Sequence, residues 1–162
     1  MARLQLTSTS FTHGGEIPRK CGYKNGNISP PLTISGIPNG TQSLTLIMDD
    51  PDAMAAVGKV WVHWVMCNLN PTITEIGEDN HRQTNKILME KKELPWMEGM
   101  TDFGEVGYGG PAPPDKRHTY VFKLYALDSE LDLPGKSTKA DVEKAMEGHI
   151  IEQTQLTGTY AP

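Results

Sequence analysis

Residues 107–127 read Gly-Tyr-Gly-Gly-Pro-Ala-Pro-Pro-Asp-Lys-Arg-His-Thr-Tyr-Val-Phe-Lys-Leu-Tyr-Ala-Leu, a loop rich in glycine and proline that passes through a histidine into an aromatic run. The first half suits neither a helix nor a central strand, because proline has no N–H to donate and glycine weakens both elements. The second half alternates, which predicts a strand with one face formed by His118, Tyr120, Phe122 and Leu124. A backbone-lined pocket that leads into a strand is therefore expected.

The composition bounds the class of protein. The chain has 162 residues, which fits one domain over residues 1–162, and its 37% apolar content with 16 glycines and 12 prolines favours a mainly β or mixed architecture with many turns. A formal net charge of −5 argues against binding to nucleic acid, because that binding depends on many Lys and Arg contacts to phosphates.

The N-terminal residues Met-Ala-Arg-Leu-Gln-Leu-Thr lack the apolar core of a signal peptide, and no run is long enough to span a bilayer. We therefore expect a cytoplasmic protein without integral membrane contact. Cys21 and Cys67 are too few and too far apart for a metal-binding pattern. Without an export signal, both are expected to be reduced thiols.

Two further segments predict the strands around the pocket. Ser43–Met48 is nearly continuous apolar sequence and runs directly into Asp49-Asp50-Pro51-Asp52, which by itself could be only a solvated turn. Val60–Asn68 is aromatic and β-branched, and its apolar character on both sides predicts a central strand. Strict alternation would place Trp61, His63 and Val65 on one face, and Val60, Val62, Trp64 and Met66 on the other.

The remaining segments carry weaker signals. Leu4–Thr9 alternates weakly and Leu32 shares a strand face with Ile34, whereas Pro71–Met100 is polar and aperiodic. Within that stretch Glu90-Lys-Lys-Glu suits a solvated loop or a short helix, and Gln155–Tyr160 either returns to the sheet or docks as a loop. Asp102-Phe-Gly matches a protein-kinase tripeptide by chance, since the other kinase signatures are missing.

One helix is well marked near the C-terminus. Thr138 and Asp141 resemble a capping box, in which each side chain bonds the backbone N–H of the other residue. The apolar face that follows predicts a helix reaching Ile150, with Val142, Ala145, Met146, His149 and Ile150 at helical spacing.

These parts can converge on one pocket. The N–H groups of Gly109 and Gly110 could approach an anion closely because no Cβ intervenes, and Pro111 would stiffen the wall. The imidazoles of His63 and His118 could donate hydrogen bonds to phosphate or carboxylate oxygens, more strongly when protonated. The other expected parts are Asp50, which would orient one imidazole, and Trp61 and Tyr120, which would supply an apolar floor and a hydroxyl.

The motifs Asp50-Pro-Asp-Ala, Trp61-Val-His-Trp, Gly107-Tyr-Gly-Gly-Pro-Ala-Pro-Pro and His118-Thr-Tyr-Val-Phe, in this order, resemble the phosphatidylethanolamine-binding protein family. The bacterial and archaeal branch, often labelled Raf-kinase-inhibitor-like, is the closer match. Asn27-Ile-Ser-Pro-Pro-Leu and Ala145-Met-Glu-Gly-His-Ile support the same resemblance, which extends from about Phe11 to Tyr160.

The resemblance implies a mainly β fold: an antiparallel β-sandwich with Greek-key connections and a helix near the C-terminus. It also implies a small anion pocket formed by Asp50, Trp61, His63, Gly109, Gly110, Pro111, His118 and Tyr120. The chain departs from the family pattern at three positions. Met54 replaces a usual proline, Thr119 replaces the usual arginine after the histidine, and Thr101 replaces a common asparagine.

The leading hypothesis is a non-enzymatic binding protein for a small anion, such as a phosphate- or carboxylate-bearing ligand or a phospholipid-like headgroup, without a cofactor or a bound metal. By analogy with the family, its surface could inhibit or scaffold a kinase or a protease, and relatives indicate that a homodimer is possible. Two alternatives stay open. Asp50, His63 and His118 could form the metal site of an enzyme, or both histidines could be satisfied core groups of a structural sandwich.

Overall fold

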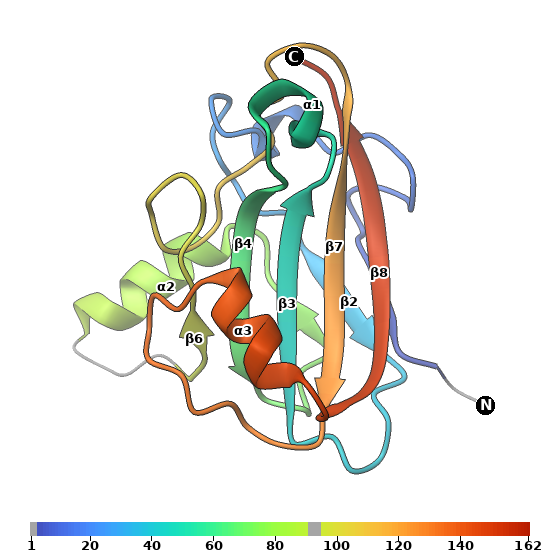
Figure 1. Ribbon diagram of the computed structural model, residues 1–162, viewed down its shortest axis with the longest axis vertical. Coiled ribbons are helices and arrows are strands. Elements are labelled where there is room, and N and C mark those ends of the chain that lie inside the picture. The colour runs from blue at the N-terminus through green and yellow to red at the C-terminus, as the bar shows by residue number, and fades with distance from the viewer. Residues whose placement is uncertain (1–2, 91–94) are drawn as a thin grey trace.

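Two antiparallel sheets pack face to face in the computed structural model, which describes residues 3–90 and 95–162 (Figure 1). The large sheet has the order β6 (Met97–Glu98), β4 (Trp61–Leu69), β3 (Ser43–Asp50), β7 (His118–Leu127) and β8 (Ile150–Tyr160). The small sheet has the order β1 (Gln5–Thr7), β2 (Leu32–Ser35) and β5 (Glu75–Ile76). The helices are the 3-10 helix η1 (Arg19–Cys21), α1 (Ala53–Val57), α2 (Asn80–Met89) and α3 (Lys139–Met146). The predicted mainly β fold is confirmed.

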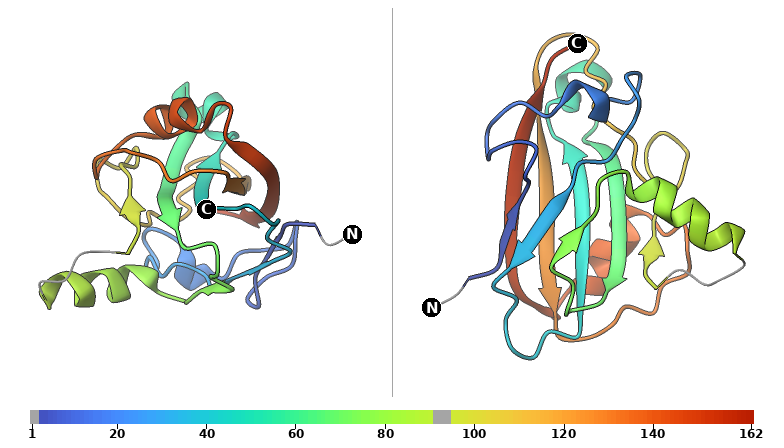
Figure 2. Two further views of the ribbon diagram at one scale, coloured as in Figure 1. Left: turned by 90° about the horizontal axis from the view of Figure 1, so that it is seen from below. Right: turned by 180° about the vertical axis from the view of Figure 1, so that it is seen from behind.

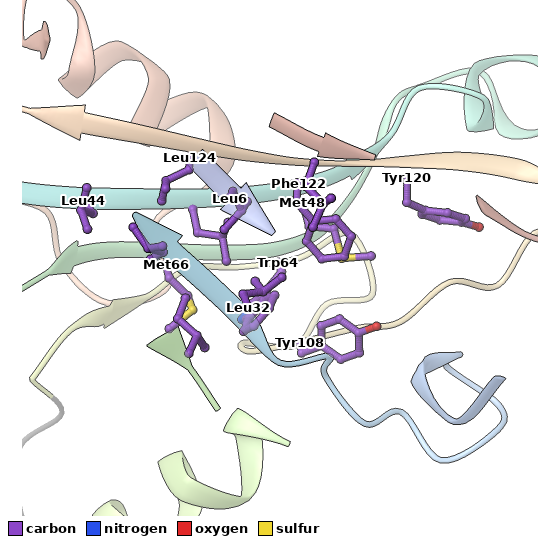
Figure 3. Close-up of a cluster of buried hydrophobic side chains, with 14 of the residues drawn as sticks. Leu6, Leu32, Leu44, Met48, Trp64, Met66, Tyr108, Tyr120, Phe122 and Leu124 are labelled. Atoms are coloured by element: carbon purple, nitrogen blue, oxygen red, sulfur yellow. The ribbon is translucent and has the colours of Figure 1, made fainter. Parts of the chain in front are cut away.

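The main core lies between the two sheets. Leu6 and Leu32 of the small sheet face Leu44, Phe122 and other buried side chains of the large sheet (Figure 3). Burying a side chain of this size stabilises the fold by about 1.5–3 kcal/mol. The contact between the sheets therefore supplies much of the stability that holds the strand ends in place.

A second core covers the opposite face of the large sheet, where α3 packs (Figure 2). Val142 and Met146 of α3 are buried against Ile47, Val65 and Leu127. The predicted capping box is present, because Thr138 Oγ1 accepts from the N–H of Asp141 and Asp141 Oδ2 accepts from the N–H of Thr138. The large sheet is thus covered on both faces.

The predicted extension of α3 to Ile150 is wrong. The helix ends at Met146, because Glu147 leaves the helical region and Gly148 adopts a left-handed conformation with φ of 80°. The chain then reverses, and Ile150 is already the first residue of β8. Of the two alternatives for Gln155–Tyr160, the return to the sheet is the one observed, and the strand begins five residues earlier.

Strand β7 follows the predicted alternation, and β4 does not. The β3–β4 register pairs Met48 with Trp64 and Asp49 with Val62, so that His63 is an extra residue in a β-bulge. Val62 and Val65 both pack into the core beneath α3, whereas Trp64 belongs to the core between the sheets. The predicted face of Trp61, His63 and Val65 is therefore wrong, although the predicted internal position of the strand in the sheet is confirmed.

The segment between β4 and β7 is partly helical. Helix α2 begins at Asn80, whose N–H donates to the hydroxyl of Ser29 over 2.8 Å. The predicted loop or short helix at residues 90–93 lies mostly outside the described residues. Cys21 and Cys67 are both free and buried, in different cores. Within the described ranges, none of the helices is long and apolar enough to cross a membrane.

The carboxyl group of Glu98 on β6 is buried and only half satisfied. Its Oε1 accepts from Trp96 Nε1 over 2.9 Å, and its Oε2 has no hydrogen-bond partner among the described residues. Burial raises the pKa of Glu98 from an ordinary 4.5 to about 7. Between these two values the unfolded chain releases a proton that the folded chain keeps, so the free energy of unfolding falls as pH rises.

We therefore expect the substitution Glu98→Gln to stabilise the protein by about 3 kcal/mol at pH 8 and to have little effect at pH 4. Urea denaturation at both pH values measures the difference. Glu147→Gln is the matched control, because Glu147 is exposed and the same charge is removed. An equal change for Glu98→Gln at both pH values would show that ionisation of Glu98 does not oppose folding.

Candidate functional site

A pocket of about 240 Å³ opens at one end of the large sheet. At this end β3 runs into α1 (Figure 1). Its lining consists of Asp50, Ala53, Ala56, Val57, Trp61, His63, Phe103, Ala112, Pro114, His118 and Tyr120. Five of the eight residues expected from the sequence are among them. Gly109, Gly110 and Pro111 are not.

The strand ends explain how the five side chains meet. Asp50 is the last residue of β3 and pairs with Trp61, the first residue of β4. The bulge in β4 brings the ring of His63 against Tyr120 of β7, with ring centroids 5.1 Å apart. His118 and Tyr120 are two residues apart and share a face of β7.

The imidazole of His118 lies between two carboxylates. Its Nδ1 is 2.6 Å from Asp50 Oδ2 and its Nε2 is 2.7 Å from Asp115 Oδ1, while its side chain is fully buried. Burial alone would lower the pKa of His118, but hydrogen bonds and attraction from the two aspartates outweigh it, and the pKa is raised. A protonated ring donates from both nitrogens, which fits two carboxylate acceptors.

The Asp-Pro-Asp turn is part of the framework of the site rather than a solvated turn. Asp50 is buried, and its second oxygen accepts from the N–H of Asp52 over 2.9 Å. Asp52 in turn accepts from the N–H of Thr119 over 2.8 Å, which fastens the start of β7 to the turn. Both contacts hold the Asp50 carboxylate in position beside His118.

His63 differs from the expected charged donor. Its Nδ1 lies 2.6 Å from the carbonyl oxygen of Gly109, so this nitrogen must carry a proton and donate it. Burial lowers the pKa of His63, against smaller opposing effects of Gly109 and Asp50. In the neutral ring Nε2 can then only accept a hydrogen bond, and His118 is the better candidate for a cationic donor.

The N–H groups of Gly109 and Gly110 both donate hydrogen bonds within the protein. The N–H of Gly109 donates to the carbonyl of His63 over 2.8 Å, and the N–H of Gly110 donates to Asn27 Oδ1 over 2.7 Å. The predicted approach of these two N–H groups to an anion is therefore wrong. Gly110 is instead required because the backbone of Cys21 packs against its Cα, which leaves no room for a Cβ.

Pro111 lies on the other side of the loop. It lines a neighbouring pocket of about 290 Å³, together with Arg19, Lys24, Asn25, Ala112, Pro113, Pro114, Tyr160 and Pro162. The two pockets share Ala112 and Pro114. The loop after Gly110 is thus a thin wall between them.

Phe103 is a wall residue that the sequence analysis did not assign to the pocket. Its ring stacks on Tyr23 at 4.2 Å and meets the rings of Trp61 and His63 edge-on at 5.7 and 5.3 Å. Asp102 holds this segment in place by accepting from the N–H of Val62 over 2.7 Å. The tripeptide that matches a kinase motif by chance is therefore structural here, and its place beside the pocket follows only from the tertiary fold.

Two donors at the pocket have no hydrogen-bond partner within the described part of the chain: the indole N–H of Trp61 and the hydroxyl of Tyr120. In Figure 3 the Tyr120 ring lies at one end of the core cluster, with its hydroxyl directed away from the other side chains. Burial, together with the charge of Asp50, raises the pKa of Tyr120, so the hydroxyl keeps its proton. Leaving a buried donor unpaired costs about 1–3 kcal/mol.

The geometry does not favour the metal site considered from the sequence. Both nitrogens of His118 face carboxylate oxygens, and Nδ1 of His63 faces a carbonyl. Among the residues that the structure describes, no three His, Cys, Asp or Glu side chains are grouped as metal ligands. Asp50, His63 and His118 are close together but are arranged as hydrogen-bonded partners.

Comparisons with known proteins identify the family and the fold. The family model described as phosphatidylethanolamine-binding protein matches residues 7–161. The chain belongs to the phosphatidylethanolamine-binding protein family. Curated relatives include proteins named UPF0098 from Chlamydia pneumoniae, 40% identical, and from Methanothermobacter thermautotrophicus, 41% identical. Each alignment covers 97% of this chain and 98% of the relative.

Solved structures of the family share the fold over nearly the whole chain. The homologue CT736 from Chlamydia trachomatis is 36% identical with a TM-score of 0.85, over 99% of this chain and 98% of that one. Escherichia coli YbcL, described as a new member of the mammalian family, is 32% identical with a TM-score of 0.86, over 98% of each chain. The resemblance found in the sequence is thereby confirmed.

Each departure from the family pattern lies within two residues of a side chain that lines the pocket. Met54 is exposed on α1, and Thr119 is the second residue of β7, where its N–H donates to Asp52. Thr101 is buried, and its hydroxyl donates to the carbonyl of Glu105 over 2.7 Å, which closes the turn that carries Phe103. Thr101 therefore has a structural role, whereas Met54 and Thr119 are only next in sequence to the pocket residues Ala53 and His118.

Proposed function

We propose that this member of the phosphatidylethanolamine-binding protein family is a non-enzymatic binding protein whose pocket holds a small ligand by a phosphate or carboxylate group. The observation that carries the proposal is the contact of Asp115 with His118 Nε2 at 2.7 Å. A protonated imidazole held by Asp50 on one side and bonded to a carboxylate on the other is a site suited to an anionic oxygen. Hydrogen bonds between charged partners of this kind are about twice as strong as neutral ones.

The rest of the pocket supports the same ligand class. The unpaired donors of Trp61 and Tyr120 would gain partners from an oxygen-rich group. Ala53, Ala56 and Val57 of α1 form an apolar side that suits a short carbon chain. A volume of about 240 Å³ fits a headgroup-sized molecule rather than a whole lipid.

The lining gives chemical reasons for binding without catalysis. The lining residues include no serine, cysteine, threonine or lysine, and the Asp50 carboxylate is already bonded by His118 and the N–H of Asp52. The Nδ1 proton of each histidine is held by a fixed acceptor, Asp50 or the carbonyl of Gly109. The site gives no reason to add a kinase or protease target to the proposal.

Replacement of Tyr120 by phenylalanine tests the proposal with little risk to the fold. We expect about tenfold weaker binding of inorganic phosphate and phosphorylethanolamine, because a hydrogen bond to a charged group is lost. Stability should change little, because in the free protein this hydroxyl has no well-formed hydrogen bond and lies only near Asp50 and the backbone of Ala112. Calorimetric titration measures the first effect and urea denaturation the second.

Two controls accompany this experiment. Tyr125→Phe changes the opposite face of the same strand, in the core beneath α3, and should leave binding unchanged. Ethanolamine, which lacks the phosphate, should not bind, whereas phosphate and phosphorylethanolamine both should. Binding of ethanolamine alone, or of none of the three, would overturn the proposed ligand class.

A further inference from the structure

Asp115 lies on the exposed part of the loop between Pro114 and β7. Its side chain is 41% exposed, and one of its oxygens contacts His118, three residues further along the chain. The hydrogen bond from His118 lowers the pKa of Asp115, so the carboxylate is ionised at neutral pH. The carboxylate of Asp115 is therefore an anion of the protein itself that already accepts the hydrogen bond from His118 Nε2.

This contact leaves His118 without a free donor. An imidazolium ring has two N–H groups, and here Asp50 takes one and Asp115 takes the other. The side chain of His118 is also fully buried in this arrangement. A ligand oxygen can reach His118 only if one of the two carboxylates moves away.

The two carboxylates differ in how firmly they are held. Asp50 is in β3 with a side chain that is 4% exposed, and it accepts a second hydrogen bond from the N–H of Asp52. Asp115 is outside the strands, and its charge is already partly hydrated. Displacing Asp115 into water therefore costs less than displacing Asp50, which would leave a buried charge unpaired.

We propose that Asp115 is an intramolecular competitor of the ligand, which sets the affinity of the pocket by occupying the position of the anionic group. This inference rests on the proposed function and names the residue that tunes it. A ligand then binds only the fraction of molecules in which Asp115 has left His118, and its apparent affinity is lower by that fraction. This fraction does not depend on the ligand, so the apparent affinity of every anion is reduced by the same factor.

The selectivity of the pocket comes from the ligands themselves, because a common factor leaves the ratio of two affinities unchanged. A monocarboxylate ligand only replaces the carboxylate of Asp115 by another carboxylate. Its interaction with His118 is therefore little stronger than that of Asp115. A phosphate monoester brings more charge and more acceptor oxygens than a carboxylate does. The site therefore selects phosphate esters over simple carboxylates.

The test compares the wild-type protein with Asp115→Asn and Asp115→Ala by calorimetric titration with inorganic phosphate, phosphorylethanolamine and acetate. Asparagine keeps the shape of the side chain and removes its charge, whereas alanine removes the contact. The titrations are run at pH 5, 6 and 7, because loss of Asp115 removes one of the two groups that raise the pKa of His118. Asp132→Asn, at an exposed aspartate in the loop beyond the other end of β7 (Figure 1), controls for the change in net charge.

Both Asp115 variants should bind each anion more tightly, by about tenfold or more for alanine, and acetate binding should become measurable. Equal or weaker binding by the variants, with normal binding by the wild type, would overturn the competitor role and leave the proposed function standing. That result would mean that Asp115 only positions the loop. If neither the wild type nor the variants bind phosphate or phosphorylethanolamine, the proposed function itself fails, and the inference with it.

Discussion

Replacement of His118 by leucine is expected to lower the free energy of unfolding by about 3–5 kcal/mol, measured by urea denaturation near pH 6. The imidazole is the cationic partner of the Asp50 carboxylate, which is buried. Removing one member of a buried ion pair leaves the other charge without compensation, and this costs more than the pair itself contributes. The same substitution should abolish phosphate binding.

Two comparisons make this prediction specific. His149 pairs with Asp128 at 2.8 Å on the surface, with both side chains about half exposed, so His149→Leu should cost less than about 1 kcal/mol. Adding Asp50→Asn to His118→Leu should recover part of the loss, because the uncompensated charge is removed. A small effect of His118→Leu, or no recovery in the double variant, would contradict a charged pair at this position.

Replacement of Gly110 by alanine is expected to destabilise the protein by at least about 3 kcal/mol. An added Cβ would overlap the carbonyl oxygen of Cys21, which is backbone and cannot move aside as a flexible side chain can. The loop would have to shift, and the bond from the Gly110 N–H to Asn27 would be lost with it. Thermal and urea unfolding both measure the effect.

Gly135→Ala is the matched control for Gly110→Ala. A Cβ at Gly135 meets no atom within 4 Å, and its φ is not in the left-handed region, so this substitution should be neutral or slightly stabilising. A Gly110→Ala protein as stable as the wild type would show that the loop does not pack closely on Cys21. It would also reopen a role for the glycine amide in binding.

The strands of the sandwich could be predicted wherever one face is buried along their whole length. Strand β7 alternates through Tyr120 and Phe122, and each of these side chains lies in the core between the sheets. The faces of strand β4 could not be predicted. One extra residue at His63 reverses the alternation after it, and residue types alone do not reveal such a bulge. The end of α3 was also missed, because apolar spacing continues into β8 after the left-handed Gly148.

The candidate site could also be predicted only in part from the sequence. Residue type and strand ends were enough to bring Asp50, His63 and His118 together in one pocket. They could not show which acceptor each N–H bonds, so the amides of Gly109 and Gly110 were predicted to face a ligand while they bond His63 and Asn27. The contact of Asp115 with His118 depends on how the loop folds back, which sequence spacing alone does not determine.

A crystal structure of the protein soaked in concentrated phosphorylethanolamine tests the ligand site and the role of Asp115 together. We expect phosphate density within hydrogen-bonding distance of His118 Nε2 and the Tyr120 hydroxyl, with the Asp115 carboxylate turned out into solvent. An empty pocket with Asp115 still bonded to His118, or phosphate bound only on the Arg19 side of the loop, would contradict it.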